Sequence, residues 1–60
     1  MHPKLLSTPE AAEMLGISAG TMIVWRSTQR VNLPYVKLSR AVKYRLEDIE
    51  AFIAQNTISN

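Results

Sequence analysis

The stretch from Thr8 to Trp25 reads TPEAAEMLGISAGTMIVW, and it decides the fold because it contains two helix starts close together. Thr8 is predicted to be the N-cap of a first helix, with Pro9 at the first helical position. Gly16 is predicted to end this helix, and Ser18 is predicted to cap a second one. Two helices joined by so short a connection must cross at a steep angle.

The spacing of small and apolar residues in the same stretch is that of a helix-turn-helix. Ala12 is small where the first helix meets the second, and Gly16 tolerates a positive φ at the turn. Ile17 supplies an apolar turn residue, and Met22 and Trp25 supply two inward-facing anchors one turn apart on the second helix. The alternative is an ordinary helical hairpin, which also favours glycine at the turn and alanine at the crossing.

If Met22 and Trp25 face the core, a step of 100° per residue decides which residues of the second helix point outward. They are predicted to be Gly20, Ile23, Val24 and Ser27, flanked by Ala19, Thr21 and Arg26. This face would enter the major groove of DNA, with the helix N-terminus nearest the phosphates. The hydroxyls of Ser18 and Thr21 would either hold a phosphate or cap the helix.

Ile23 and Val24 leave two interpretations open, because a base-reading helix usually carries Arg, Asn or Gln. The pair either contacts thymine methyl groups or is covered by the core or a partner protein. Arg30, near the end of the second helix, is a further predicted DNA contact.

A β-hairpin is predicted after Asn32 and Pro34, because residues 35–38 and 42–45 alternate polar with apolar. Ser39, Arg40 and Ala41 form the predicted joint. The side chains predicted to face the core are Val36, Leu38, Val42 and Tyr44, and those predicted to face solvent are Lys37, Lys43 and Arg45.

Arg40, with Ser39 beside it at the tip, suits a minor groove, where narrow A·T tracts attract arginine. The alternative for these charges is a hairpin edge that discourages sheet-to-sheet pairing.

A third helix is predicted to begin at Glu47 and Asp48, with Leu46 or Arg45 as a weak N-cap and Ile49, Phe52 and Ile53 on its inner face. The predicted fold class is therefore mainly α with a small β-hairpin: a helix-turn-helix, a two-stranded wing and a C-terminal helix. Residues 1–60 are expected to form a single domain, ordered from about residue 5 to residue 54.

The charges are unevenly distributed along the chain. The net charge is only +2, but no acid lies between Met14 and Leu46. This central segment carries six basic residues and hence +6, while Lys4 and the five acids give −4 outside it. Acids suit helix N-termini, but that does not explain their absence from the middle, which favours a basic surface facing phosphates.

The composition argues against several other functions. There is no cysteine, and the single histidine, His2, has no partner at a metal-ligand spacing, so we expect no metal or cofactor. A core this small leaves little room for an active site, and no set of nucleophile and base is present, so we do not expect an enzyme. No apolar run is long enough to span a bilayer and no signal peptide is apparent, so we expect a cytoplasmic protein.

Several stretches together resemble the excisionase-type winged helix-turn-helix domains of phages and mobile elements, which share their fold with the DNA-binding half of MerR-type regulators. The resemblance runs from about Leu5 to Ala54, and its stretches are LLSTPEAAEMLGIS, TMIVWR, the Leu33-Pro34 pair, and YR leading into DIEAFI.

The resemblance implies a helix pair in the major groove of double-stranded DNA and a wing in the minor groove. It also implies one of two bacterial, nucleoid-associated functions. The first is a recombination directionality factor that bends attachment-site DNA and recruits an integrase or other recombinase. The second is a small prophage or plasmid transcriptional regulator of the AlpA type. Two positions depart from the pattern, because family members often carry arginine near Ile23 and Val24, and because only Arg40 matches their Gly-Arg-Arg wing tip.

A third possibility, from the predicted apolar pair of Ile23 and Val24 alone, is a small protein-interaction module.

A lone module of this size buries little interface, so we expect several copies to associate on adjacent DNA sites. The residues predicted to contact DNA are Ser18, Ala19, Gly20, Thr21, Ile23, Val24, Arg26, Ser27, Arg30, Lys37, Ser39, Arg40, Lys43 and Arg45.

Overall fold

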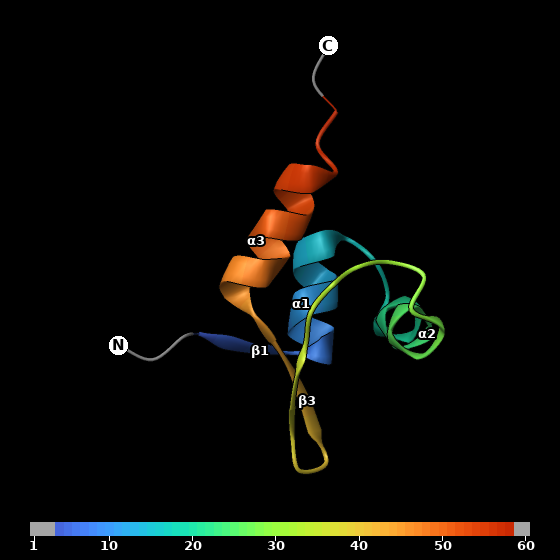
Figure 1. Cartoon of the computed structure of the whole chain (residues 1–60), viewed down its shortest axis with the longest axis vertical. Coiled ribbons are helices and arrows are strands. Elements are labelled where there is room, and N and C mark those ends of the chain that lie inside the picture. Colours follow the sequence, from blue (N-terminus) through green and yellow to red (C-terminus); the bar gives the residue numbers. More distant parts are fainter. Residues whose placement is uncertain (1–3, 59–60) are drawn as a thin grey trace.

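The computed structural model describes residues 4–58, and His2, for which no metal-ligand partner was expected, is outside them. The described residues form three helices and a three-stranded sheet, which confirms the predicted class of a mainly helical fold with a β wing. In chain order the elements are β1 (Leu5–Ser7), α1 (Thr8–Leu15), α2 (Ala19–Thr28), β2 (Val36–Leu38), β3 (Ala41–Arg45) and α3 (Leu46–Gln55) (Figure 1).

The N-cap of α1 is Ser7, so the prediction that Thr8 would cap this helix was wrong by one residue. The Ser7 hydroxyl accepts a hydrogen bond from the Glu10 backbone N–H at 3.2 Å, and the Glu10 carboxylate accepts one from the Ser7 N–H at 2.9 Å. This reciprocal pair is a capping box, which satisfies two backbone donors of the first turn. The bond that the Ser7 N–H donates to the carboxylate favours its ionised form and lowers the pKa of Glu10.

The turn between α1 and α2 depends on Gly16, as the sequence predicted. Gly16 has a φ of 73°, a left-handed conformation that glycine adopts without steric cost. Its N–H donates to the Glu13 carbonyl at 3.1 Å, and the Ile17 N–H donates to the Ala12 carbonyl at 3.0 Å. These bonds satisfy the last carbonyls of α1 and turn the chain sharply into α2.

The sheet contains one strand that the sequence did not predict. Strand β1 pairs antiparallel with β3, and β3 pairs antiparallel with β2, so that the strand order is β1-β3-β2. β1 therefore joins the start of the chain to the wing and leaves β3 as the central strand.

The hairpin register differs from the predicted one. Leu38 lies opposite Ala41, so the turn consists of Ser39 and Arg40, and Ala41 belongs to β3. Ser39 has a φ of 57°, which allows this tight connection.

Directly opposed residues of an antiparallel pair share a face of the sheet, so the register also assigns side chains to faces. One face carries Leu6, Lys37, Val42 and Tyr44, and the other carries Val36, Leu38, Lys43 and Arg45. The prediction that Val36 and Leu38 would face the core beside Val42 and Tyr44 was therefore wrong, and Leu38 is 49% exposed. The prediction assumed a three-residue joint, whereas the turn has two residues. A shift of the pairing register by one residue moves the side chains of a strand to the opposite face of the sheet.

The buried core lies where α1, α2, α3 and the sheet meet. It consists of Leu6, Ala11, Ala12, Met22, Tyr44 and Ile49. Trp25, predicted as a core anchor, is partly buried and packs against this core, with its ring 6.0 Å from that of Phe52. Ile53 was predicted to face inward but is 40% exposed, since only Ile49 and Phe52 of the predicted inner face turn toward the core.

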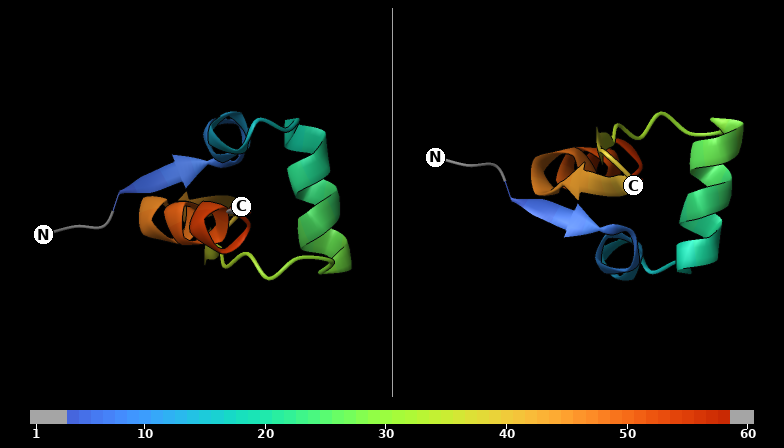
Figure 2. Two further views of the ribbon diagram at one scale, coloured as in Figure 1. Left: turned by 90° about the horizontal axis from the view of Figure 1, so that it is seen from above. Right: turned by 90° about the horizontal axis from the view of Figure 1, so that it is seen from below.

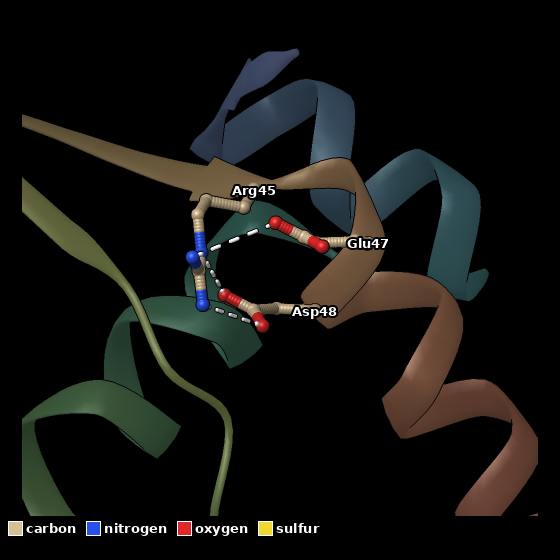
Figure 3. A network of polar contacts seen from close by, with 3 residues as sticks. All are labelled: Arg45, Glu47 and Asp48. Carbon is tan, nitrogen blue, oxygen red and sulfur yellow. Dashed lines mark hydrogen bonds and ion pairs between the residues drawn. The ribbon is translucent and has the colours of Figure 1, made fainter. Parts of the chain in front are cut away.

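The start of α3 is held by an ion-pair network in place of a capping side chain. Arg45 occupies the N-cap, where its side chain makes no capping hydrogen bond. Its guanidinium donates to both carboxylate oxygens of Asp48, from Nε at 2.7 Å and from Nη2 at 3.1 Å, and lies 3.5 Å from Glu47 (Figure 3). Asp48 and Glu47 thereby raise the pKa of Arg45. The predicted weak cap is confirmed, and the acids of the first turn compensate for it.

Among the described residues, no helix has both the length and the apolar character needed to cross a bilayer.

Candidate nucleic-acid interface

Helix α2 lies at one side of the molecule, where it packs against α1 and where its Trp25 ring lies 6.0 Å from the Phe52 ring of α3 (Figures 1 and 2). Met22 is buried at 1% exposure and attaches the helix to the core. Gly20, Ile23, Val24 and Ser27 are all exposed, which confirms the outward face predicted from the position of the anchors. Ile23 and Val24 are 49% and 53% exposed, so the core does not cover them. The outer side of α2 is therefore free to contact another molecule.

The hydroxyls at the start of α2 bond to each other and to the backbone. Ser18 is the N-cap, and its Oγ accepts from the Thr21 N–H at 3.1 Å and lies 2.9 Å from Thr21 Oγ1. Of the two roles that the sequence left open for these hydroxyls, the structure contains the capping role. Ala19 and Gly20 follow in the first turn, where backbone N–H groups point out of the helix.

Arg26 was predicted to flank the outer face, but its side chain turns toward the wing. Its Nη1 donates to the Tyr44 hydroxyl at 3.3 Å, and its guanidinium carbon lies 5.9 Å from the centre of the Tyr35 ring. The two tyrosine rings are themselves 6.3 Å apart. Arg26 thus links α2 to the loop before β2 and to the central strand. Tyr35 and Tyr44 could not be predicted from the sequence as partners of Arg26, since both residues are distant from it in the chain.

A cleft of about 560 Å³ separates the end of α2 from the start of the wing. Residues 29–35 form one wall, and side chains of α2 and Tyr44 form the rest. Arg30 lies in this cleft and is exposed, whereas Arg26 in the same cleft is partly buried. The cleft therefore presents positive charge between the two elements that were predicted to contact DNA.

The wing carries its charges on both faces. Ser39 and Arg40 form the exposed turn, and the exposed Lys37 and partly buried Lys43 lie on opposite faces of the hairpin. Figure 1 shows the wing extending away from α1 and α3. Arg45 is at the other end of β3, where its guanidinium is paired with Asp48. The structure thus brings Arg40 and the two lysines to the hairpin and holds Arg45 at the base of α3.

The acids of the chain lie outside α2 and the wing, although Asp48 and Glu47 pair with Arg45 at the base of β3 and the charge of Lys43 acts on Glu10. Glu10 and Glu13 are in α1, and Glu47, Asp48 and Glu50 are in α3. No acid occurs in α2, in the loop that follows it, or in β2 and β3. The basic segment of the sequence therefore corresponds to one part of the fold, made of α2, the cleft and the wing.

Comparison with protein families agrees with this geometry. A family model described as a helix-turn-helix domain matches residues 5–57, which is most of the chain. The chain belongs to this helix-turn-helix family. No curated protein matches the sequence, and no solved structure matches it either.

Membership of the helix-turn-helix family indicates that the protein binds double-stranded DNA. In a helix-turn-helix, the second helix is the one that contacts the major groove. In this protein that helix is α2, and its exposed side carries Ile23 and Val24.

Proposed function

We propose that this helix-turn-helix protein is an excisionase-like architectural factor of a phage or mobile element, which binds and bends double-stranded DNA. The observation that supports this role is the apolar outer face of α2, where Ile23 and Val24 are exposed. Such a face offers few hydrogen bonds to base edges. Selectivity would then depend strongly on DNA shape and deformability, as is usual for proteins that bend DNA.

In the proposed complex, α2 lies in a major groove and the wing lies in the adjacent minor groove. The phosphate backbone that separates these grooves would then cross the cleft between α2 and the wing, where Arg30 is exposed. Lys37 and Lys43, on opposite faces of the hairpin, would each face one wall of the minor groove. Arg40 at the tip would point toward its floor, where narrow A·T tracts concentrate negative potential.

The remaining predicted contacts come from the first turns of α2 and from its exposed face. The backbone N–H groups of Ala19 and Gly20 would face a phosphate, since helix N-termini favour anions. Ser18 and Thr21 would contribute mainly by holding this turn in place, and Ser27 would contact the DNA beside Val24. Arg26 and Arg45 would act through the fold, because both guanidinium groups already have partners in the protein.

A module of this size covers little DNA, so we also propose that several copies bind adjacent sites and that a recombinase contacts the array. Association between copies on one DNA raises the affinity without new contacts to the bases.

A bending assay tests the architectural role. The protein is titrated onto a duplex that carries a donor and an acceptor fluorophore at its ends, at low salt, with the Arg40→Ala variant as the matched control. We expect energy transfer to rise on binding, and to rise less with Arg40→Ala at equal occupancy. Binding without any change in energy transfer would contradict the architectural role and favour a transcriptional regulator that acts by occupying its site.

A further inference from the structure

We propose that Ile23 and Val24 recognise the 5-methyl groups of thymine in the major groove. The proposal rests on the proposed function, since it assumes that α2 lies in that groove. Beyond DNA binding, it assigns the thymine methyl as the group that is recognised, and Ile23 and Val24 as the side chains that contact it. The protein would then select thymine by apolar contact, with little use of the hydrogen-bonding edges of the bases.

Most of the polar side chains of α2 already have hydrogen-bond partners within the protein. Thr21 bonds to Ser18, and the Thr28 hydroxyl donates to the Val24 carbonyl at 2.7 Å. Arg26, the one long polar side chain among the described residues of α2, turns to Tyr44 and Tyr35. Ser27 remains on the exposed face, and a lone hydroxyl pairs with several bases and discriminates poorly between them.

The side chains that remain for contact in the middle of α2 are aliphatic. Ile23 and Val24 are consecutive residues in the middle of α2 and are 49% and 53% exposed. In the major groove, the thymine methyl is the apolar group by which an A·T pair differs from a G·C pair. A branched aliphatic side chain that packs on this methyl removes both apolar surfaces from water. No acid in α2 or the wing opposes the approach of the DNA backbone to this face.

The expected effect follows from the size of one methyl group. Burial of one carbon of this kind changes an equilibrium by about fourfold. Two side chains that each cover one methyl would therefore contribute about 15-fold to the affinity. The effect should be confined to the one or two base pairs under the middle of α2.

The test uses a duplex that the full chain selects from a pool of random sequences. Each thymine of this duplex is replaced in turn by deoxyuridine, which keeps the base pairing and lacks the methyl group. We expect the affinity for the duplex to fall about fourfold when deoxyuridine replaces thymine at one or two positions, and to change little at the others. At those positions, replacement of the T·A pair by C·G should lower the affinity. Replacement of the same T·A pair by 5-methylcytosine·G should lower it much less, because 5-methylcytosine keeps the methyl group.

The matched control is the variant Ile23→Ala with Val24→Ala. Both side chains are exposed, so the variant should stay folded, which circular dichroism checks directly. We expect deoxyuridine to have no effect on its affinity at the same positions. A deoxyuridine penalty that persists in this variant would show that the methyl acts through DNA shape, and it would overturn the proposal.

Two further outcomes separate this proposal from the proposed function. Salt-dependent duplex binding without a deoxyuridine effect at any position would refute the recognition of methyl groups and leave DNA binding intact. It would also favour a partner protein on the Ile23–Val24 surface. Failure to bind any duplex would refute both proposals together.

Discussion

Comparison of Arg26→Ala with Arg30→Ala tests whether Arg26 supports the fold while Arg30 contacts DNA. The guanidinium of Arg26 donates to the Tyr44 hydroxyl at 3.3 Å and lies 5.9 Å from the Tyr35 ring centre. The variant removes both contacts, and with them the link between α2 and the wing. Arg30 is exposed in the same cleft, so Arg30→Ala removes an equal charge as the matched control.

The magnitude follows from the two contacts of Arg26. A hydrogen bond at this long distance contributes about 0.5 kcal/mol, near the lower end of the usual range. The contact between the guanidinium and the Tyr35 ring contributes about 0.5–1 kcal/mol. Their sum is about 1–1.5 kcal/mol, from which the higher helix propensity of alanine subtracts a few tenths. For a domain of this size, each kcal/mol corresponds to a Tm change of about 4–8 °C.

Thermal unfolding followed by Trp25 fluorescence measures the effect, since Trp25 is the only tryptophan of the chain. We expect Arg26→Ala to lower the Tm by about 3–10 °C and Arg30→Ala to change it by less than about 3 °C. When the two variants are compared at equal folded fraction, the affinity for a DNA duplex should fall more for Arg30→Ala than for Arg26→Ala. Equal Tm changes in the two variants, or a larger loss of affinity for folded Arg26→Ala, would refute the assignment of Arg26 to the fold.

Three further predictions concern the cap, the core and the wing. Hydrogen bonding from Ser7 lowers the pKa of Glu10 from its ordinary value of 4.5. The ionised carboxylate therefore stabilises the folded protein fully above pH 4.5, and this contribution to the free energy of unfolding is lost as the pH falls through the lowered pKa. Melting curves between pH 6 and pH 3 should show a smaller decline for Glu10→Gln, and an identical decline would exclude the capping box as a cause. Met22→Ala should cost about 2–5 kcal/mol, which is comparable with the whole stability of a small domain, whereas the exposed Val24→Ala should stay folded; circular dichroism distinguishes these outcomes. Arg40→Ala should weaken binding to duplexes with A·T-rich flanks by about 1–3 kcal/mol, and an equal loss on G·C-rich duplexes would identify Arg40 as a phosphate contact.

The sequence was most informative where a local rule determines the structure. Gly16 and Ser18 end one helix and start the next through their own backbone and side-chain chemistry, so the steep helix pair could be predicted. The exposed face of α2 followed from the helical period once Met22 and Trp25 were assigned as anchors. The Ser7 cap could also have been found, because Ser7 and Glu10 have the spacing of a capping box.

The errors arose where residues far apart in the chain decide the structure. Strand β1 contains three residues and exists because β3 pairs with it, so its own sequence carries little signal. The hairpin turn lacks glycine and asparagine, and the positive φ of Ser39 is unusual for serine. The resulting register put Lys37 and Lys43 on opposite faces, and the packing of Tyr35 and Tyr44 turned Arg26 inward.

A salt titration of duplex binding tests the central claim most directly, namely that the basic surface of α2, the cleft and the wing binds the phosphates of DNA. The affinity for a random-sequence duplex is measured at several salt concentrations, with NMR shifts recorded for residues 20–27 and 37–43. Contact with four or five phosphates predicts that the logarithm of the affinity falls against the logarithm of the salt concentration with a slope near −4. The shifts should appear in both segments. A slope near zero, or shifts confined to Ile23 and Val24, would contradict the account.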